Sequence, residues 1–325
     1  MSSKFQRSVL ITGGTIGLGY QGALAIAREC PTYQVIIASR TDNGAAETIN
    51  RLLGQNNVQF MKLDLSSLSQ VRSFATDWET KNFPPLYSLV CNAALQFPGA
   101  AEYTEDGIEM TFGVSHVGHA LLFSLLRPYL ASTARVVITA SGTHDPAQKT
   151  GMPNPFYHSA EELAHPLPKY THGNGRQHYT NAKLANVMYM YALHRRFMKI
   201  NEKTGNHWTV TTLCPGLMFG TGLIRNASKI EQFLWYKIAP WLTSLARILV
   251  SPNIHTPRES GGALAKLAVS SDVEGISGAY FEGKKEIKSS QDSYDEDKQE
   301  DLWKWTIETV ARDEEKLSFS LQDLM

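Results

Sequence analysis

Short apolar segments alternate with segments of helical periodicity along this chain, and this alternation constrains the fold most strongly. Helical patterns lie between the apolar segments, at about residues 19–28, 48–53, 68–78 and 110–130, and again from about Tyr179. Parallel strands that are buried on both faces need such crossover helices. The order therefore predicts an α/β protein with a doubly wound parallel sheet, in a single domain over residues 1–325. The predicted strands are residues 9–12, 34–39, 58–63, 86–91, 135–139 and 209–213.

Two segments fall outside this alternation. Residues 221–260 contain the apolar run FLWYKIAPWLTSLARILV at 233–250, which Lys237, Pro240 and Arg247 interrupt. The run is short for a membrane-spanning helix, so we predict a pair of amphipathic helices that covers a substrate pocket, with attachment to a membrane surface as the alternative. Residues 282–301 are charged and loop-like, and they begin a C-terminal extension over 282–325. We expect a helix with Trp303 and Trp305 after this stretch.

Charge and cysteine content exclude several classes of protein. The chain has 31 basic and 31 acidic residues, so no overall positive field favours nucleic acid or an anionic membrane as partner. Cys30, Cys91 and Cys214 are far apart, which suits a reducing compartment and argues against a disulfide framework or a zinc ribbon. Because residues 1–8 are polar, we expect no secretory signal. We expect a cytoplasmic protein, and the sequence leaves a homo-oligomer open.

A glycine-rich turn, TGGTIGLG at residues 12–19, follows the first strand directly. Glycines let the backbone approach a pyrophosphate at a helix N-terminus, where amide hydrogens and the helix dipole favour anions. An ordinary strand-to-helix loop is the alternative, but the place after the first strand favours a dinucleotide. The residues assigned to the cofactor here are Gly13, Thr15, Ile16, Gly17, Leu18 and Gly19.

The ends of the next two strands indicate which cofactor binds. Arg40 stands where an acidic residue would bind a ribose 2′-hydroxyl. Its guanidinium favours a 2′-phosphate, hence NADP(H) over NAD(H), although Arg40 could also be merely solvated. Asp64 ends the third strand, where it could accept a hydrogen bond from the adenine amino group, cap the following helix, or do both.

Tyr179 and Lys183 lie four residues apart at the start of a predicted helix. Positions i and i+4 share a helix face, so an ammonium there would lower the pKa of the phenol from its usual value near 10. Such a pair can donate or accept a proton in carbonyl–alcohol chemistry. The spacing alone is weak, because most pairs of this kind are surface residues on helices.

These segments together resemble the short-chain dehydrogenase/reductase superfamily, and the resemblance covers most of the chain. The segments LVCNAA (89–94), SGTHDP (141–146), PGLMFGTGL (215–223) and GAYF (278–281) are similar to one branch. That branch contains the retinol-dehydrogenase-like, WW-domain-oxidoreductase-like and protochlorophyllide-reductase-like proteins. The pieces that match the superfamily, in order, are the turn at 12–19, Asp64-Leu65, CNAA at 91–94, Ser141, Tyr179 with Lys183, and Pro215-Gly216.

The resemblance implies a Rossmann-like fold and a role for individual residues. Tyr179 would be the general acid in reduction, and Lys183 would bind the nicotinamide ribose and lower the Tyr179 pKa. Ser141 would polarise the substrate carbonyl. The other residues that the resemblance assigns to the cofactor site are Leu65 beside Asp64, Asn92, Ala93, Pro215, Gly216 and Thr221.

The chain departs from the family pattern in two places. Ser115 stands where the family usually has an asparagine, which is implied to kink its helix and to hold a water that links the lysine to solvent. Serine can still bond a water, so we predict that Ser115 serves an altered proton relay, with a repurposed site as the alternative. The interval from Ser141 to Tyr179 is long, and we expect it to shape the substrate pocket. Its five histidines are scattered among prolines without ligand spacing, so no metal site is expected.

We therefore expect an NADPH-dependent carbonyl reductase, or the reverse alcohol dehydrogenase. Its substrate would be a fairly large apolar small molecule of secondary metabolism, such as a polyketide, terpenoid or steroid-like ketone. One alternative is the reduction of a carbon–carbon or imine double bond on the same scaffold. Another is a non-catalytic NADP(H)-binding regulatory protein.

Overall fold

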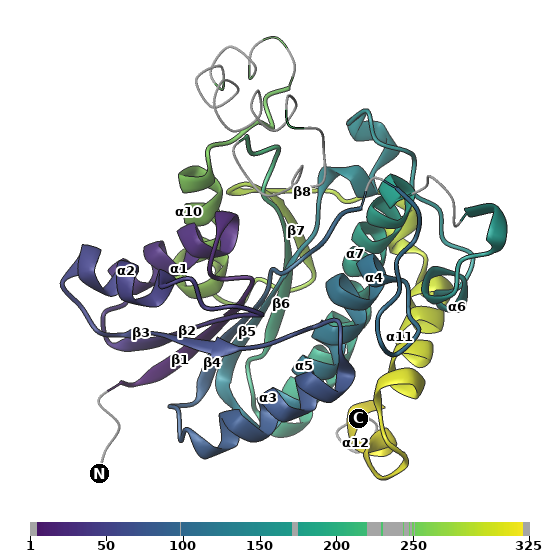
Figure 1. Ribbon diagram of the computed structural model, residues 1–325. Coiled ribbons are helices and arrows are strands. Elements are labelled where there is room, and N and C mark those ends of the chain that lie inside the picture. Colours follow the sequence, from purple (N-terminus) through teal and green to yellow (C-terminus); the bar gives the residue numbers. More distant parts are fainter. Residues whose placement is uncertain are drawn as a thin grey trace.

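One eight-stranded sheet organises the chain (Figure 1). The computed structural model describes residues 5–97, 99–170, 175–219 and 251–320, together with residues 229, 243, 247 and 249. The strand order is β3-β2-β1-β4-β5-β6-β7-β8. Neighbouring strands from β3 to β7 are parallel, and β8 runs antiparallel to β7. The predicted doubly wound parallel sheet is confirmed, with an antiparallel edge strand in addition.

Each strand that the sequence predicted is present, with ends that differ by a few residues. β5 extends five residues earlier than predicted, and β7 and β8 were not predicted. The strands are β1 (Arg7–Thr12), β2 (Tyr33–Ser39), β3 (Val58–Lys62), β4 (Leu86–Cys91), β5 (Leu130–Thr139), β6 (Thr209–Cys214), β7 (Ala279–Glu282) and β8 (Lys285–Ile287).

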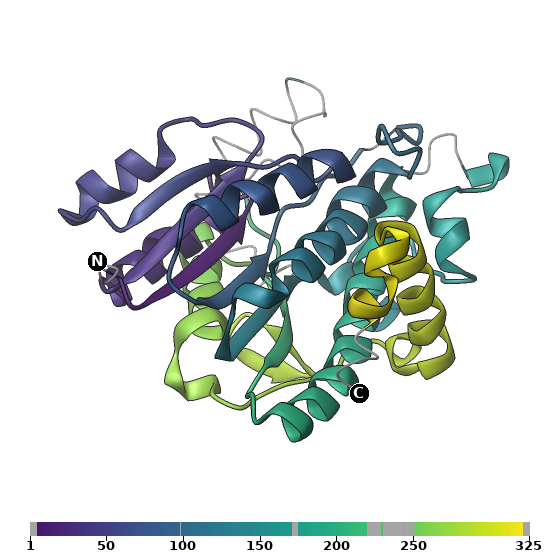
Figure 2. The same cartoon turned by 90° about the horizontal axis from the view of Figure 1, so that it is seen from below.

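Helices cover both faces of this sheet (Figures 1 and 2). Helices α1 (Gly17–Glu29), α2 (Ala45–Leu53) and α10 (Pro257–Val269) bury small and branched apolar side chains against one face. The opposite face is covered by α3 (Leu68–Thr80), α5 (Gly118–Leu126) and α7 (Gly175–Thr204). Because both faces are covered, the inner strands consist of nearly continuous apolar residues.

The C-terminal extension contains the expected helix with Trp303 and Trp305, and the stretch before it is more regular than the predicted loop. It contains β8 and then α11 (Glu296–Val310), which lies along α7 (Figure 1), and it continues into α12 (Lys316–Ser320). The Trp303 ring stacks on Tyr189 of α7 with 5.4 Å between ring centroids, and the Arg196 guanidinium lies 3.9 Å from the Trp303 centroid. In α11 the charged residues are mainly exposed, and the buried residues are Gln299, Leu302, Trp303, Thr306, Ile307 and Val310.

The predicted helix over residues 110–130 is interrupted. It consists of α4 (Met110–Phe112), a π-helical turn over Gly113–Val117, α5 and a 3-10 turn over Arg127–Tyr129. A further short helix, α6 (Ala160–Ala164), precedes α7. The π-helical turn contains Ser115, so the helix is irregular at this position although the asparagine is absent.

No helix within the described ranges is long and apolar enough to cross a membrane. The predicted helix pair over 233–250 lies outside the described residues, apart from residues 243, 247 and 249. Thr221 also lies outside them.

Glu109 begins α4 with a buried carboxylate. Its side chain accepts hydrogen bonds from the backbone N–H groups of Thr111 at 3.0 Å and Phe112 at 2.8 Å, and it is 1% exposed. Burial raises the pKa of Glu109 to about 7, and the two hydrogen bonds offset part of that rise. The folded protein therefore binds a proton here at pH values where the unfolded chain does not.

This buried carboxyl predicts how stability depends on pH. Because the folded-state pKa lies above the usual 4.5, the stabilisation is complete below about pH 4.5 and is lost as pH rises through 7. Between pH 5 and 8 Glu109 alone should lower the free energy of unfolding by about 1–3 kcal/mol, while the buried neutral rings of His116 and His119 contribute a rise up to about pH 6.5. Denaturant unfolding of Glu109→Gln beside the wild type isolates the Glu109 contribution, and a difference between the two proteins that does not change with pH would contradict the account.

Candidate active site

A cavity of about 990 Å³ lies at the carboxyl ends of the parallel strands. It spans the point between β1 and β4 where the strand order reverses, which is where doubly wound sheets bind ligands. Of the predicted site residues in the described ranges, all but Gly19 and Ser115 line this cavity. They are Gly13, Thr15, Ile16, Gly17, Leu18, Arg40, Asp64, Leu65, Asn92, Ala93, Ser141, Tyr179, Lys183, Pro215 and Gly216.

The glycine turn forms one end of the cavity. Gly13 has φ +64° and Gly17 has φ +57°, a left-handed conformation that other residues rarely adopt. A Cβ at Gly19 would lie 2.3 Å from the Gly13 carbonyl oxygen, so Gly19 lets the turn close against α1 without lining the cavity itself. The N-cap residue of α1, Ile16, makes no side-chain hydrogen bond, so the first amides of α1 have no side-chain cap. Such a helix N-terminus suits a phosphate.

Hydrogen bonds join the ends of β1 and β4 beside this turn. The Thr12 hydroxyl accepts from the backbone N–H groups of Asn92 at 2.9 Å and Ala93 at 3.0 Å, and Asn92 Nδ2 donates to the Thr12 carbonyl at 2.8 Å. His119 Nε2 lies 2.7 Å from the Thr12 hydroxyl. Sequence reasoning did not single out Thr12 or His119 for this role, because their contact joins residues 107 positions apart.

Arg40 and Asp64 lie at the ends of β2 and β3. The Arg40 side chain is exposed and lines the cavity. Asp64 Oδ1 accepts from the backbone N–H of Ser66 at 2.9 Å and from its hydroxyl at 2.6 Å. The N-cap of α3 is Ser67, so the alternative in which Asp64 caps that helix is wrong. Local bonding to Ser66 holds the carboxylate of Asp64 at the cavity wall.

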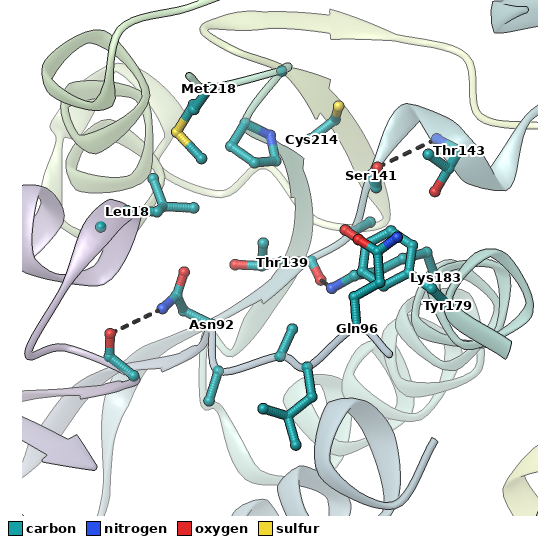
Figure 3. Close-up of a pocket in the computed structure, with 18 of the residues that line it drawn as sticks. Leu18, Asn92, Gln96, Thr139, Ser141, Thr143, Tyr179, Lys183, Cys214 and Met218 are labelled. Atoms are coloured by element: carbon teal, nitrogen blue, oxygen red, sulfur yellow. Dashed lines mark hydrogen bonds between the residues drawn. The ribbon is translucent and has the colours of Figure 1, made fainter. Parts of the chain in front are cut away.

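Tyr179, Lys183 and Ser141 converge at the other part of the cavity (Figure 3). Tyr179 and Lys183 project from α7, with the Lys183 Nζ 5.5 Å from the centroid of the Tyr179 ring. Lys183 Nζ donates to the carbonyl oxygen of Thr139, the last residue of β5, at 3.0 Å. The side chain of Ser141, two residues further on, hydrogen-bonds with Tyr179. This geometry places two hydroxyl groups and one ammonium around a single position.

Burial dominates the protonation of this group. It raises the pKa of Tyr179 to about 12, although the hydrogen bond with Ser141 acts in the opposite direction. It lowers the pKa of Lys183 to about 8. The predicted lowering of the Tyr179 pKa by Lys183 is therefore wrong for this arrangement: desolvation raises the pKa, the Ser141 side chain is the group that lowers it, and the Lys183 ammonium donates to the Thr139 carbonyl. At neutral pH Tyr179 is a neutral phenol, which is the form that donates a proton.

Ser115 lies away from the large cavity. It is 2% exposed, and its hydroxyl has no hydrogen-bond partner in the described part of the chain. With His119, Asn186 and Tyr189 it lines a separate cavity of about 10 Å³. Asn186 Nδ2 donates to the Thr139 carbonyl oxygen at 3.2 Å, the same acceptor that Lys183 uses. The sequence carried no sign of this shared acceptor.

The rest of the large cavity has mixed polarity. Part of the long interval before α7, including Gln148 and Met152, lines it. Asn253 Nδ2 donates to Glu282 Oε2 at 2.7 Å and lies 3.6 Å from Cys214 Sγ. The wall beyond Ser141 is thus not purely apolar. The apolar side chains of this part are Leu95, Met152, Leu217 and Met218, and the polar ones include Gln96, Gln148, Lys149, Asn253 and Glu282.

Comparison with known proteins identifies the family. Residues 7–156 match the family model described as short chain dehydrogenase. A polyprenol dehydrogenase of Danio rerio is 32% identical over 313 residues, which are 93% of this chain and 86% of that protein. The chain belongs to the short-chain dehydrogenase family. The resemblance that the sequence motifs indicated is thereby confirmed, and with it an oxidoreductase family that uses a nicotinamide cofactor.

Further short-chain dehydrogenases show the same relationship. A protochlorophyllide reductase of Daucus carota is 32% identical over 327 residues, covering 94% of this chain and 78% of that protein. The fold matches a crystal structure of an uncharacterized protein from Mycobacterium paratuberculosis with a TM-score of 0.65. That match is 24% identical and covers 95% of this chain and 94% of the other.

The close contact at Gly19 predicts a loss of dinucleotide binding. In Gly19→Ala the added Cβ would meet the Gly13 carbonyl, so the turn must open where a pyrophosphate would bind. We expect the Kd for the nicotinamide dinucleotide, measured by fluorescence titration, to rise at least tenfold. Gly262→Ala on α10 is the matched control, because its Cβ would meet no atom within 4 Å. Wild-type affinity in Gly19→Ala would contradict this role of the turn.

Proposed function

We propose that this short-chain dehydrogenase is an NADPH-dependent carbonyl reductase that also oxidises the corresponding alcohol. One observation carries the proposal. Tyr179, Ser141 and the Lys183 ammonium line one part of a cavity whose other part is lined by the glycine turn and Arg40. A hydride donor and a carbonyl group could therefore meet in front of a proton donor.

The residues would act as follows. Ser141 donates a hydrogen bond to the substrate carbonyl oxygen and polarises the carbonyl. Tyr179 gives its proton to the same oxygen as negative charge develops there, and the carbonyl carbon gains a hydride, so the product is an alcohol. NADPH, when bound, supplies that hydride. Lys183, whose ammonium lies 5.5 Å from the centroid of the Tyr179 ring, would bind the hydroxyls of the nicotinamide ribose.

The neutral state of Tyr179 supports reduction as the favoured direction near pH 7. A phenol whose pKa is about 12 is ready to donate, whereas oxidation of an alcohol needs the phenolate as base. Ser115 lies outside this cavity, so we propose that it acts on proton supply only indirectly, through the small cavity that it shares with Asn186.

The proposed substrate is a fairly large and mainly apolar ketone. Leu95, Met152 and Leu217 contribute apolar surface, and a volume of about 990 Å³ leaves room beside a dinucleotide. The name of the Danio rerio relative states a polyprenol, which is a long apolar alcohol. The Asn253–Glu282 pair would accommodate a polar group on such a substrate. Secondary metabolism supplies ketones of this kind.

A second candidate is the reduction of a carbon–carbon or imine double bond on the same scaffold, and the Daucus carota relative is itself named a reductase, of protochlorophyllide. It would use the same hydride donor and the same phenol, with a different carbon as hydride acceptor. A non-catalytic NADP(H)-binding regulator is the third candidate, and turnover assays separate it from the other two.

Arg40 predicts the cofactor preference. Its guanidinium would pair with the 2′-phosphate of NADPH, which NADH lacks. In Arg40→Ala we expect the KM for NADPH to rise at least tenfold and the KM for NADH to stay within twofold. Arg51→Ala on α2 changes an exposed arginine outside the cavity and serves as control. Equal effects on both cofactors would contradict the assignment.

The substitution Tyr179→Phe tests whether Tyr179 is the proton donor. The variant loses only the hydroxyl, so NADPH affinity should stay within twofold while kcat for reduction falls at least a thousandfold. The assay follows NADPH absorbance with a panel of cyclic and long-chain ketones. Turnover that survives in Tyr179→Phe would refute the proton-donor role. Absence of turnover in the wild type in both directions, with NADPH still bound, would favour the regulator.

A further inference from the structure

His144 connects Ser141 to a distant part of the chain. It lies three residues after Ser141, in a 3-10 turn over Gly142–His144, and its side chain is 1% exposed. Its Nδ1 lies 2.7 Å from the Ser141 carbonyl oxygen, and its Nε2 lies 3.0 Å from the backbone nitrogen of Ser290. Ser290 belongs to the C-terminal extension, 146 positions further along the chain.

These two contacts determine the tautomer of His144. The Ser290 backbone N–H can only donate, so Nε2 must carry a lone pair. The ring proton is therefore on Nδ1, which donates to the Ser141 carbonyl. The same carbonyl also accepts from the backbone N–H of His144 at 3.1 Å. Burial lowers the pKa of His144, which is consistent with a neutral ring.

Residues of β6 and β7 also contact the short segment from Ser141 to His144. The His144 ring packs against Tyr280 of β7, with 4.8 Å between ring centroids. The Gly142 N–H donates to Cys214 Sγ at the end of β6, at 3.1 Å. Rotation of the Ser141 backbone would therefore break bonds to β6 and to the His144 ring.

We propose that His144 is a positioning residue that sets the direction of the Ser141 hydroxyl toward Tyr179 and the substrate. Through Ser290 it makes this direction depend on the C-terminal extension. The inference rests on the proposed function, in which Ser141 polarises the carbonyl.

Two substitutions of His144 distinguish the effect of its hydrogen bonds from the effect of its packing against Tyr280. His144→Phe keeps an aromatic ring against Tyr280 and removes both hydrogen bonds. His144→Asn places an amide nitrogen close to the position of Nδ1, so it keeps a donor for the Ser141 carbonyl and loses the bond to Ser290. Both variants are measured for kcat, the KM for a reduced ketone, the Kd for NADPH and the melting temperature.

A substitution at Ser290 can remove the hydrogen bond from the Ser290 N–H to His144 Nε2 while His144 stays unchanged. Ser290 has φ −60°, which proline adopts, so Ser290→Pro removes the donor N–H with little change of backbone conformation. Ser290→Ala keeps the N–H and is the matched control, since the Ser290 hydroxyl has no partner among the described residues.

We expect His144→Phe to lower kcat at least tenfold with the Kd for NADPH within twofold of the wild type. His144→Asn should recover kcat to within about threefold, and Ser290→Pro should lower kcat about threefold while Ser290→Ala does not. A purely structural role would lower kcat, NADPH affinity and melting temperature together, without recovery in His144→Asn, and would overturn the proposal.

Two results would overturn the positioning role of His144. A folded His144→Phe with kcat within twofold of the wild type overturns the positioning role. If His144→Phe does not fold, equal kcat in Ser290→Pro and Ser290→Ala overturns it instead. Failure of the proposed function itself is seen separately, as turnover that survives in Tyr179→Phe.

Discussion

The hydrogen bond from Lys183 Nζ to the Thr139 carbonyl is the contact on which the site depends most. Lys183 is 1% exposed, and removing an ammonium from water costs several kcal/mol unless polar partners replace the lost hydration. The described protein atoms supply one such partner, at the very end of β5. This contact fixes α7 relative to the sheet, and α7 carries Tyr179. An ammonium has three donors, so the ribose hydroxyls of a nicotinamide cofactor are the natural partners for the others.

The topology of the sheet is the second feature on which the site depends. All the strands that border the cavity end at the same edge, because parallel strands joined by crossover helices point their carboxyl ends one way. Asn92 and Ser141 therefore line the same cavity although they lie far apart in the chain. The hydrogen bonds around the Thr12 hydroxyl join β1 to β4 at the point where the strand order reverses. The site follows from this topology.

Local pattern was enough to predict strands β1 to β6, the glycine turn and part of the cavity lining, but not β7 and β8. Each of these depends on side-chain periodicity or on a short motif, which neighbouring residues determine. The buried surroundings of Ser115, Asn186 and His144 could not be predicted in this way. They depend on which buried group faces which, as in the bond between His144 and Ser290. The pKa of Tyr179 was predicted in the wrong direction, because the i, i+4 spacing gives proximity and not the degree of burial.

The central claim is that hydride is delivered to the carbonyl carbon of the substrate. Deuterium labelling tests this claim most directly. NADPH carrying deuterium at the transferred position of its nicotinamide ring would be incubated with an α,β-unsaturated ketone, and the product analysed by NMR. The account predicts an allylic alcohol with deuterium on the carbon that bears the hydroxyl, and no product from Tyr179→Phe. A saturated ketone with deuterium on the β-carbon would contradict carbonyl reduction.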